Sequence, residues 1–285
     1  YETAVRENVK PPTLIAVGDV VELRDKLNFF ESKPLFGKNV IVTRSRTQSS
    51  SLVSKISDLG GNPIEVPTIK IEKIENNIAL ENEIKNIKDY TYLILTSKNA
   101  VDIFFDKLDE MDLDSRVLAN LKVCAIGSAT AKEIKNRGIK ADIVPEKFVA
   151  EYLFEELKDI LKDSDKVLIP RSKNARDFLV DKISEICEVK EVHIYETVLD
   201  DSKKDEVLDI LNSGEADYIT FASSSTVTNF VDIIGKENID KLNELKVISI
   251  GPITTQTAKS LNINVYNEAE VSTIDGMIDS IMNDK

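Results

Sequence analysis

The sequence predicts an α/β protein made of two similar domains, each a doubly wound parallel sheet. The chain of 285 residues is long enough for two ordinary domains. It also contains an internal duplication, described below. Within each copy, short apolar runs alternate with amphipathic helical patterns, which is typical of β-loop-α units in a parallel sheet.

The duplication consists of two pairs of matching segments. The first pair, A and A′, aligns residues 40–57 with 167–184 at an offset of 127, which is 167 minus 40. The second pair, B and B′, aligns residues 92–104 with 218–230 at an offset of 126, which is 218 minus 92. Because chance similarity rarely keeps register this long, each pair represents two copies of one structural unit.

The expected strands are apolar almost throughout, as strands covered on both faces should be. In chain order they include residues 40–43, 92–95, 123–126, 167–169, 218–221 and 247–250. The first is followed by a helical stripe of apolar residues from Leu52 to Leu59, which Gly60 closes as a C-cap. These patterns predict about five strands per domain. They leave open whether A packs with the adjacent B or, after a chain crossover, with the distant B′.

Composition narrows the function classes. A net charge of −13 argues against a nucleic-acid partner, because phosphate binding needs clustered Lys and Arg. No apolar run approaches the roughly 18 residues of a membrane span. One histidine and two dispersed cysteines cannot make a usual zinc site, so we expect no metal. We also expect Cys124 in a buried strand and the protein in the reducing cytoplasm.

Cofactor motifs are missing from the sequence. It has neither the glycine-rich phosphate loop of ATP-binding proteins nor the dinucleotide fingerprint, so we expect no nucleotide cofactor. A hydrolase triad would have to use His193, the single histidine, and the usual serine elbow is absent. We therefore predict a protein without a cofactor.

Small, hydroxylic or basic residues follow the expected strands, and no Asp or Glu stands among them. In a parallel sheet these positions share the ligand-binding edge, where helix N-termini point. The same residues are ordinary N-caps, which is the plainer interpretation of any one position. Together they favour a carboxylate or phosphate ligand, with these candidate binding residues: Arg44, Thr96, Ser97, Asn99, Ser128, Ser223, Ser224, Ser225, Thr254 and Thr255.

A strand is expected over residues 189–198, and strict alternation would place His193 and Tyr195 on one face. Val192 and Ile194 would then occupy the other face. We interpret His193 as a half-exposed structural residue. Tyr195 is either structural as well or a proton donor beside the anion site.

Several motifs together resemble the uroporphyrinogen-III synthase family, and the resemblance runs from about Leu35 to the C-terminus. They are residues 40–44, 95–101, 125–131, 195–197, 221–230 and 250–254, in the order and spacing of that family. Where the family often has proline, this chain has Ser45 and the segment Ser223 to Ser225. Residues 11–30 are similar to the extreme C-terminus of uroporphyrinogen-III methyltransferase. Because the chain opens on Tyr rather than Met, we expect it to be part of a longer fusion protein.

The resemblance implies two flavodoxin-like domains joined by two extended linkers, with A packed against B′ and B against A′. The implied segments are a methyltransferase remnant at 1–33, a discontinuous first domain at 34–71 and 197–285, and a second domain at 72–196. The implied substrate is hydroxymethylbilane, closed to uroporphyrinogen III with inversion of the last ring and loss of water. Tyr195 is the implied general acid, and a fused methyltransferase the implied partner. The alternative is a non-enzymatic two-domain module that binds an anionic small metabolite.

Overall fold

The computed structural model describes residues 2–7, 9, 13–14, 16–44, 46–147 and 149–283, with the side chains of 4, 25 and 46–50 left undescribed. Ser45 and the first two residues of the segment 11–30 lie outside these residues. The described chain divides into two compact units, unit 1 from residues 1–68 and 199–285, and unit 2 from residues 69–198. Unit 1 is therefore discontinuous, and the chain passes between the units twice.

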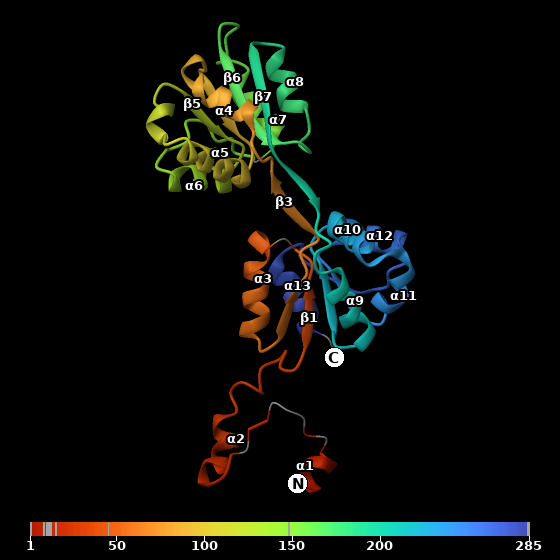
Figure 1. Ribbon diagram of the computed structural model, residues 1–285. Helices are drawn as coiled ribbons and strands as arrows, with labels where there is room; N and C mark the ends of the chain where they lie inside the picture. Colours follow the sequence, from red (N-terminus) through yellow and green to blue (C-terminus); the bar gives the residue numbers. More distant parts are fainter. Residues whose placement is uncertain are drawn as a thin grey trace. The chain divides into compact units, whose positions relative to one another are not determined.

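Unit 1 contains a five-stranded sheet in the order β10-β9-β8-β1-β2, in which all neighbouring strands pair in parallel. The strands are β1 (Asn39–Val42), β2 (Asn62–Glu65), β8 (Tyr218–Phe221), β9 (Lys246–Ser249) and β10 (Val265–Glu268). The helices are α3 (Arg46–Asp58), α9 (Lys204–Ser213), α10 (Ser224–Ile234), α11 (Ile239–Leu242), α12 (Pro252–Ser260) and α13 (Ile274–Met282). Figure 1 shows α3 and α9 on opposite faces of this sheet.

Side-chain alternation along the strands of unit 1 produces two cores. Ile41 joins the core beneath α9 and α10, whereas its neighbours Val40 and Val42 join the core beneath α3 and α13. Each of these three residues is fully buried. Successive residues of a strand point to opposite faces of the sheet. A strand that is apolar throughout is therefore covered by helices on both faces, as the sequence predicts.

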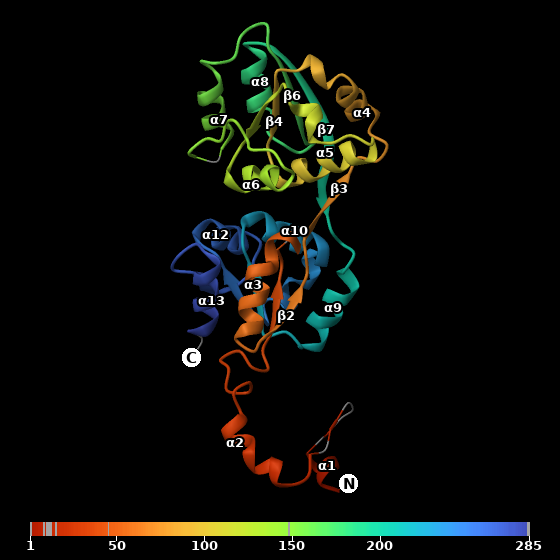
Figure 2. The same cartoon turned by 90° about the vertical axis from the view of Figure 1, so that its left-hand side faces the viewer.

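Unit 2 repeats this plan, with a five-stranded sheet in the order β3-β7-β6-β4-β5. The strands are β3 (Ile69–Lys73), β4 (Tyr92–Leu95), β5 (Lys122–Ala125), β6 (Lys166–Ser172) and β7 (Glu188–Leu199). The helices are α4 (Ile78–Lys85), α5 (Lys98–Glu110), α6 (Ser128–Asn136), α7 (Ala150–Leu157) and α8 (Phe178–Ser184). Figure 2 shows α7 and α8 on one side of the strands and α4 on the other. Cys124 of β5 is fully buried, as expected, and burial raises the pKa of its thiol to about 12.

Strand pairing resolves the question that the duplication leaves open. Val40 of A pairs with Tyr218 of B′, and Tyr92 of B pairs with Val167 of A′. The two sheets are therefore equivalent: β9-β8-β1-β2 of unit 1 corresponds to β5-β4-β6-β7 of unit 2. A parallel bridge between Cys124 and Ile143 takes the place of β10 in unit 2. The α/β fold of two similar parallel-sheet domains, the first of them discontinuous, agrees with the prediction.

Strands β3 and β7 contain residues 72 and 196, near which the domain boundaries are expected. Both belong to the sheet of unit 2 over most of their length. These two strands are the extended segments that connect the units. The chain crosses between Thr68 and Ile69 and again between Val198 and Leu199.

The N-terminal segment differs from the rest of the chain in its burial. It contains α1 (Glu2–Arg6), a 3-10 turn (Asp19–Leu23) and α2 (Arg24–Leu27). Large apolar side chains here are exposed, among them Leu14 at 99%, Val17 at 85% and Phe29 at 77%. Burial begins at Leu35, which is 3% exposed and packs in the core beneath α3.

Candidate functional site

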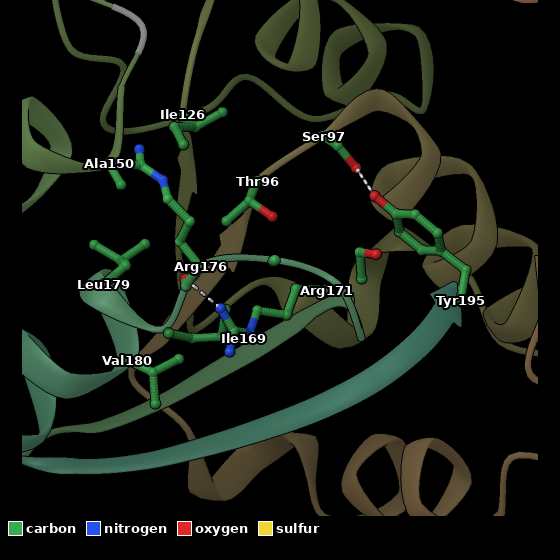
Figure 3. Close-up of a pocket in the computed structure, with 12 residues that line it drawn as sticks. Thr96, Ser97, Ile126, Ala150, Ile169, Arg171, Arg176, Leu179, Val180 and Tyr195 are labelled. Atoms are coloured by element: carbon green, nitrogen blue, oxygen red, sulfur yellow. Dashed lines mark hydrogen bonds between the residues drawn. The ribbon is translucent and has the colours of Figure 1, made fainter. Parts of the chain in front are cut away.

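A cavity of about 200 Å³ lies in unit 2, at the edge where the carboxyl ends of its strands meet. Residues that follow β4 and β5, the end of β6, the strand β7 and the start of α8 all contribute to it. Figure 3 shows its lining residues, which are Thr96, Ser97, Ile126, Ala150, Ile169, Arg171, Ser172, Ala175, Arg176, Leu179, Val180 and Tyr195. The cavity therefore combines hydroxyl groups and two arginines with an aliphatic wall.

An irregularity in strand pairing directs Tyr195 toward this cavity. Along β6 and β7, Arg171 pairs with His193, yet the next residue, Ser172, pairs with Tyr195. Ile194 is thus an extra residue, as in a β-bulge, which re-aims the side chain that follows it. Val192, Ile194 and Tyr195 consequently share one core. The expectation that Tyr195 and His193 lie on the same face is wrong, because strict alternation fails at the bulge.

The phenol of Tyr195 is held by Ser97. The two hydroxyl oxygens are 2.8 Å apart, and the tyrosine is only 6% exposed. Ser97 is also the N-cap of α5, since its Oγ accepts a hydrogen bond from the amide of Ala100 at 3.0 Å. One serine therefore satisfies a free amide at the helix start and anchors the phenol at the cavity.

Arg171 is a structural cation rather than an open anion site. Its side chain is 3% exposed and donates to Glu191 Oε1 at 2.5 Å, Asp177 Oδ1 at 2.5 Å and the carbonyl of Arg176 at 2.6 Å. Burial by itself lowers the pKa of Arg171, but the hydrogen bonds that it donates to Glu191 and Asp177 outweigh this effect and raise the pKa. Arg171 thereby ties β6 to β7 and to the start of α8.

His193 lies on the outer side of the same network. Its Nε2 is 2.5 Å from Glu191 Oε1, the oxygen that Arg171 also contacts. The histidine side chain is 44% exposed and does not line the cavity. This position fits the half-exposed structural residue that the sequence suggested.

Of the other candidate residues of unit 2, Thr96 lines the cavity, whereas Asn99 and Ser128 do not. Asn99 lies partly buried in the first turn of α5, and Ser128 is the exposed first residue of α6. Sequence reasoning missed Ser172 and Arg176 as lining residues. Both stand in the duplicated segment A′, where Ser172 matches Ser45 of A but Arg176 is aligned with Ser49, so Arg176 carries no sequence signal.

In unit 1 the candidate residues cap a helix or make contacts within the unit. Ser223 forms a capping box with Thr226 at the start of α10, and Ser224 Oγ donates to the carbonyl of Ile253 at 3.3 Å. Ser225 is exposed, with its Oγ 3.0 Å from Ser223 Oγ, and Arg44 is partly buried at the end of β1. Substrate binding by these residues stays a prediction.

Thr254 and Thr255 point into unit 1 rather than outward. They are 4% and 9% exposed. Thr255 Oγ1 donates to Glu268 Oε2 at 2.5 Å and lies 2.6 Å from Ser249 Oγ. A hydroxyl engaged in this way has little remaining capacity for a ligand.

Among the described residues no group of three His, Cys, Asp or Glu side chains could hold a metal ion, and no described helix is long and apolar enough to cross a membrane.

The chain is thus a two-unit α/β protein whose cavity lies at the carboxyl ends of the strands of unit 2, the edge at which α/β proteins commonly bind small ligands. The family model for uroporphyrinogen-III synthase HemD matches residues 50–279. The chain belongs to the uroporphyrinogen-III synthase family.

Individual relatives agree with this assignment. The porphyrin biosynthesis protein HemD of Ruminiclostridium josui is 38% identical over 282 residues, which make up 99% of this chain. The chain spans 55% of that protein, about half its length. A uroporphyrinogen-III synthase of Synechococcus elongatus is 30% identical over 252 residues, covering 86% of this chain and 95% of that protein. A crystal structure of a mutant uroporphyrinogen III synthase from Thermus thermophilus shares the fold, with a TM-score of 0.55 at 16% identity, covering 86% of this chain and 97% of that one.

Proposed function

We propose that this chain cyclises hydroxymethylbilane to uroporphyrinogen III, acting as a lyase that releases water. The observation that carries the proposal is the phenol of Tyr195, anchored at a cavity with aliphatic and hydroxylic walls. A volume of about 200 Å³ is below the roughly 300–1,000 Å³ of pockets that enclose drug-sized ligands. The cavity therefore accommodates one reacting end of the bilane rather than the whole molecule.

The proposed mechanism uses Tyr195 as a general acid. Its proton passes to the terminal hydroxyl, whose C–O bond breaks as the pyrrole nitrogen donates its electron pair, and water leaves. The resulting azafulvene carbon is attacked by the substituted end of the last ring, and the spiro intermediate fragments and recloses with that ring inverted. The proton that the ring then loses balances the one Tyr195 gave. No net oxidation occurs, so the chemistry requires no electron carrier.

The direct test is to incubate the protein with freshly generated hydroxymethylbilane and to separate the oxidised porphyrins by chromatography. We expect the type III isomer to dominate over the type I isomer of spontaneous closure. Type I alone, with bilane still bound by the protein, would favour the alternative of a non-enzymatic module for an anionic metabolite.

Binding of the substrate carboxylates at the strand ends predicts the behaviour of Ser128→Glu. Ser128 is exposed at the first position of α6, where a carboxylate favours the helix dipole, so the melting temperature should not fall. Like charges about 4 Å apart repel by about 1 kcal/mol in bulk water and about 4 kcal/mol near a protein surface, so KM should rise at least about fivefold. Steady-state kinetics measure this change.

Asn120→Glu is the matched control for that variant. Asn120 is exposed and lies just before β5, at the opposite edge of the same sheet, and the substitution adds the same charge. Its KM should equal that of the wild type. If both variants leave KM unchanged, the carboxylates bind elsewhere.

We further propose that residues 1–33 derive from the C-terminus of a methyltransferase fused to the synthase in a cytoplasmic protein. The exposed Leu14, Val17 and Phe29 support this, because apolar side chains of this size normally pack within a domain. The similarity of residues 11–30 to the methyltransferase terminus points to the same origin.

Deleting residues 1–32 tests whether the synthase needs this segment. Lys33 is retained because it packs against the turn at Gly60, and Leu35 is retained because it belongs to the core of unit 1. We expect kcat/KM within a few-fold of the full chain and a similar melting temperature. Loss of soluble protein on deletion would mean that the segment is integral to unit 1.

A further inference from the structure

We propose that Ser97 is a positioning residue for the proton donor Tyr195, rather than a ligand of the substrate. This inference rests on the proposed function. Its basis is one geometric feature: the oxygen that caps α5 also contacts the phenol, at 2.8 Å. The tyrosine ring is buried beside Val192 and Ile194, so the ring fixes the position of the phenol and Ser97 fixes its hydrogen bonding.

Counting donors and acceptors shows what this contact does. A serine hydroxyl has one donor and two lone pairs, and one lone pair of Ser97 accepts the amide of Ala100. When Ser97 donates its own proton to the tyrosine oxygen, the phenolic proton is left free to point into the cavity. After that proton has passed to the substrate, the same serine donor stabilises the phenolate.

Helix α5 strengthens this arrangement. It has 13 residues, and its N-terminus carries the positive end of the helix dipole. The chain of bonds from the Ala100 amide through Ser97 to Tyr195 links that end of the helix to the phenol oxygen. Hydrogen bonds in such a chain polarise one another, which favours the negative charge that proton donation leaves on Tyr195.

The duplicated unit supplies an internal comparison. Ser223 corresponds to Ser97 at the offset of 126 and also caps its helix, α10. The position that corresponds to Tyr195 at the offset of 127 is Thr68, whose buried hydroxyl has no hydrogen-bond partner in the described structure. Ser223 instead contacts Ser225. Capping alone thus accounts for a serine in both units, whereas the bond to a phenol is particular to unit 2.

Three substitutions separate the two roles of Ser97. Ser97→Ala removes the cap and the phenol contact, Ser97→Gly removes the contact but keeps most of the capping preference, and Ser97→Thr keeps both. We expect Ala and Gly to lower kcat about three- to tenfold with KM unchanged, and to raise the type I fraction. Thr should restore both values. Thr273→Ala removes a cap from α13 in unit 1, and should lower the melting temperature by a few degrees without changing kcat.

A double-mutant cycle with Tyr195→Phe completes the experiment. Without the phenol, Ser97→Ala should cause no further loss of kcat. Wild-type kcat in both Ser97→Ala and Ser97→Gly, with a slow Tyr195→Phe, would overturn the role of Ser97 and leave Tyr195 as the acid. An equal loss from Ser97→Ala with and without the phenol would also overturn it. Wild-type turnover in Tyr195→Phe would instead refute the proposed general acid, and the inference with it.

Discussion

Tyr195→Phe is expected to lower kcat by roughly ten- to a hundredfold and to shift the product toward the type I isomer. Proton donation by a positioned side chain typically contributes 10²- to 10⁴-fold. The loss falls at or below the low end because the pyrrole nitrogen already expels the hydroxyl readily. Phe keeps the buried ring and its packing, and Ser97 retains its bond with Ala100, so stability should hardly change. Steady-state kinetics and chromatography of the porphyrin isomers measure both effects.

Tyr90→Phe is the matched control in the same unit. Tyr90 is 3% exposed, and its hydroxyl donates to Glu83 at 2.6 Å, away from the cavity. Removing this phenol should leave kcat and the isomer ratio unchanged. If Tyr195→Phe turns over at the wild-type rate with pure type III product, the phenol is not the acid. The protein would then catalyse the reaction mainly by folding the bilane so that its reacting ends meet.

Arg171→Met is expected to produce the largest loss of stability among these variants. Removing one partner of a buried ion pair costs about 3–5 kcal/mol, and because Asp177 is largely exposed we expect about 2–4 kcal/mol. That corresponds to a decrease in melting temperature of roughly 5–15 °C. Arg171 also holds the carbonyl of Arg176 at the cavity, so kcat/KM should fall as well. Thermal unfolding followed by circular dichroism measures the first effect.

Arg116→Met removes an ion pair of the opposite kind and serves as the comparison. Its side chain is 90% exposed and pairs with Asp114 at 2.7 Å. Exposed pairs contribute little to stability, so the melting temperature should stay within about 2 °C of the wild type. An equally small change in Arg171→Met would show that the buried network does not tie α8 to the sheet.

The fold was largely predictable because its signals are local and repeated. Apolar strands, helical stripes and the duplication predicted two α/β domains. The pairing of β1 with β8 was not decided by these signals, since A carries the same pattern whether it packs with B or with B′. The match to family motifs supplied the correct pairing, and the register between Val40 and Tyr218 shows it.

The site was less predictable because it depends on single deviations from regular structure. The sequence indicated Thr96, Ser97 and Tyr195, which the structure brings to one cavity. It did not indicate the bulge at Ile194. The residues of β7 alternate regularly in the sequence, and the extra residue becomes visible only when β7 is paired with β6. Nor did it indicate that Thr255 points inward, a consequence of its contact with Glu268 of β10, the strand that follows α12.

Nuclear magnetic resonance of the bound product tests most directly whether the reaction takes place at the cavity beside Tyr195. The chain has seven tyrosines, which can be labelled with ¹³C in the ring, and Tyr195→Phe assigns the signal of Tyr195. On titration with uroporphyrinogen III, we predict that the Tyr195 signal shifts strongly through pyrrole ring currents while the Tyr90 signal stays in place. An unmoved Tyr195 signal at saturating product, in a protein that still makes the type III isomer, would contradict that location of the reaction.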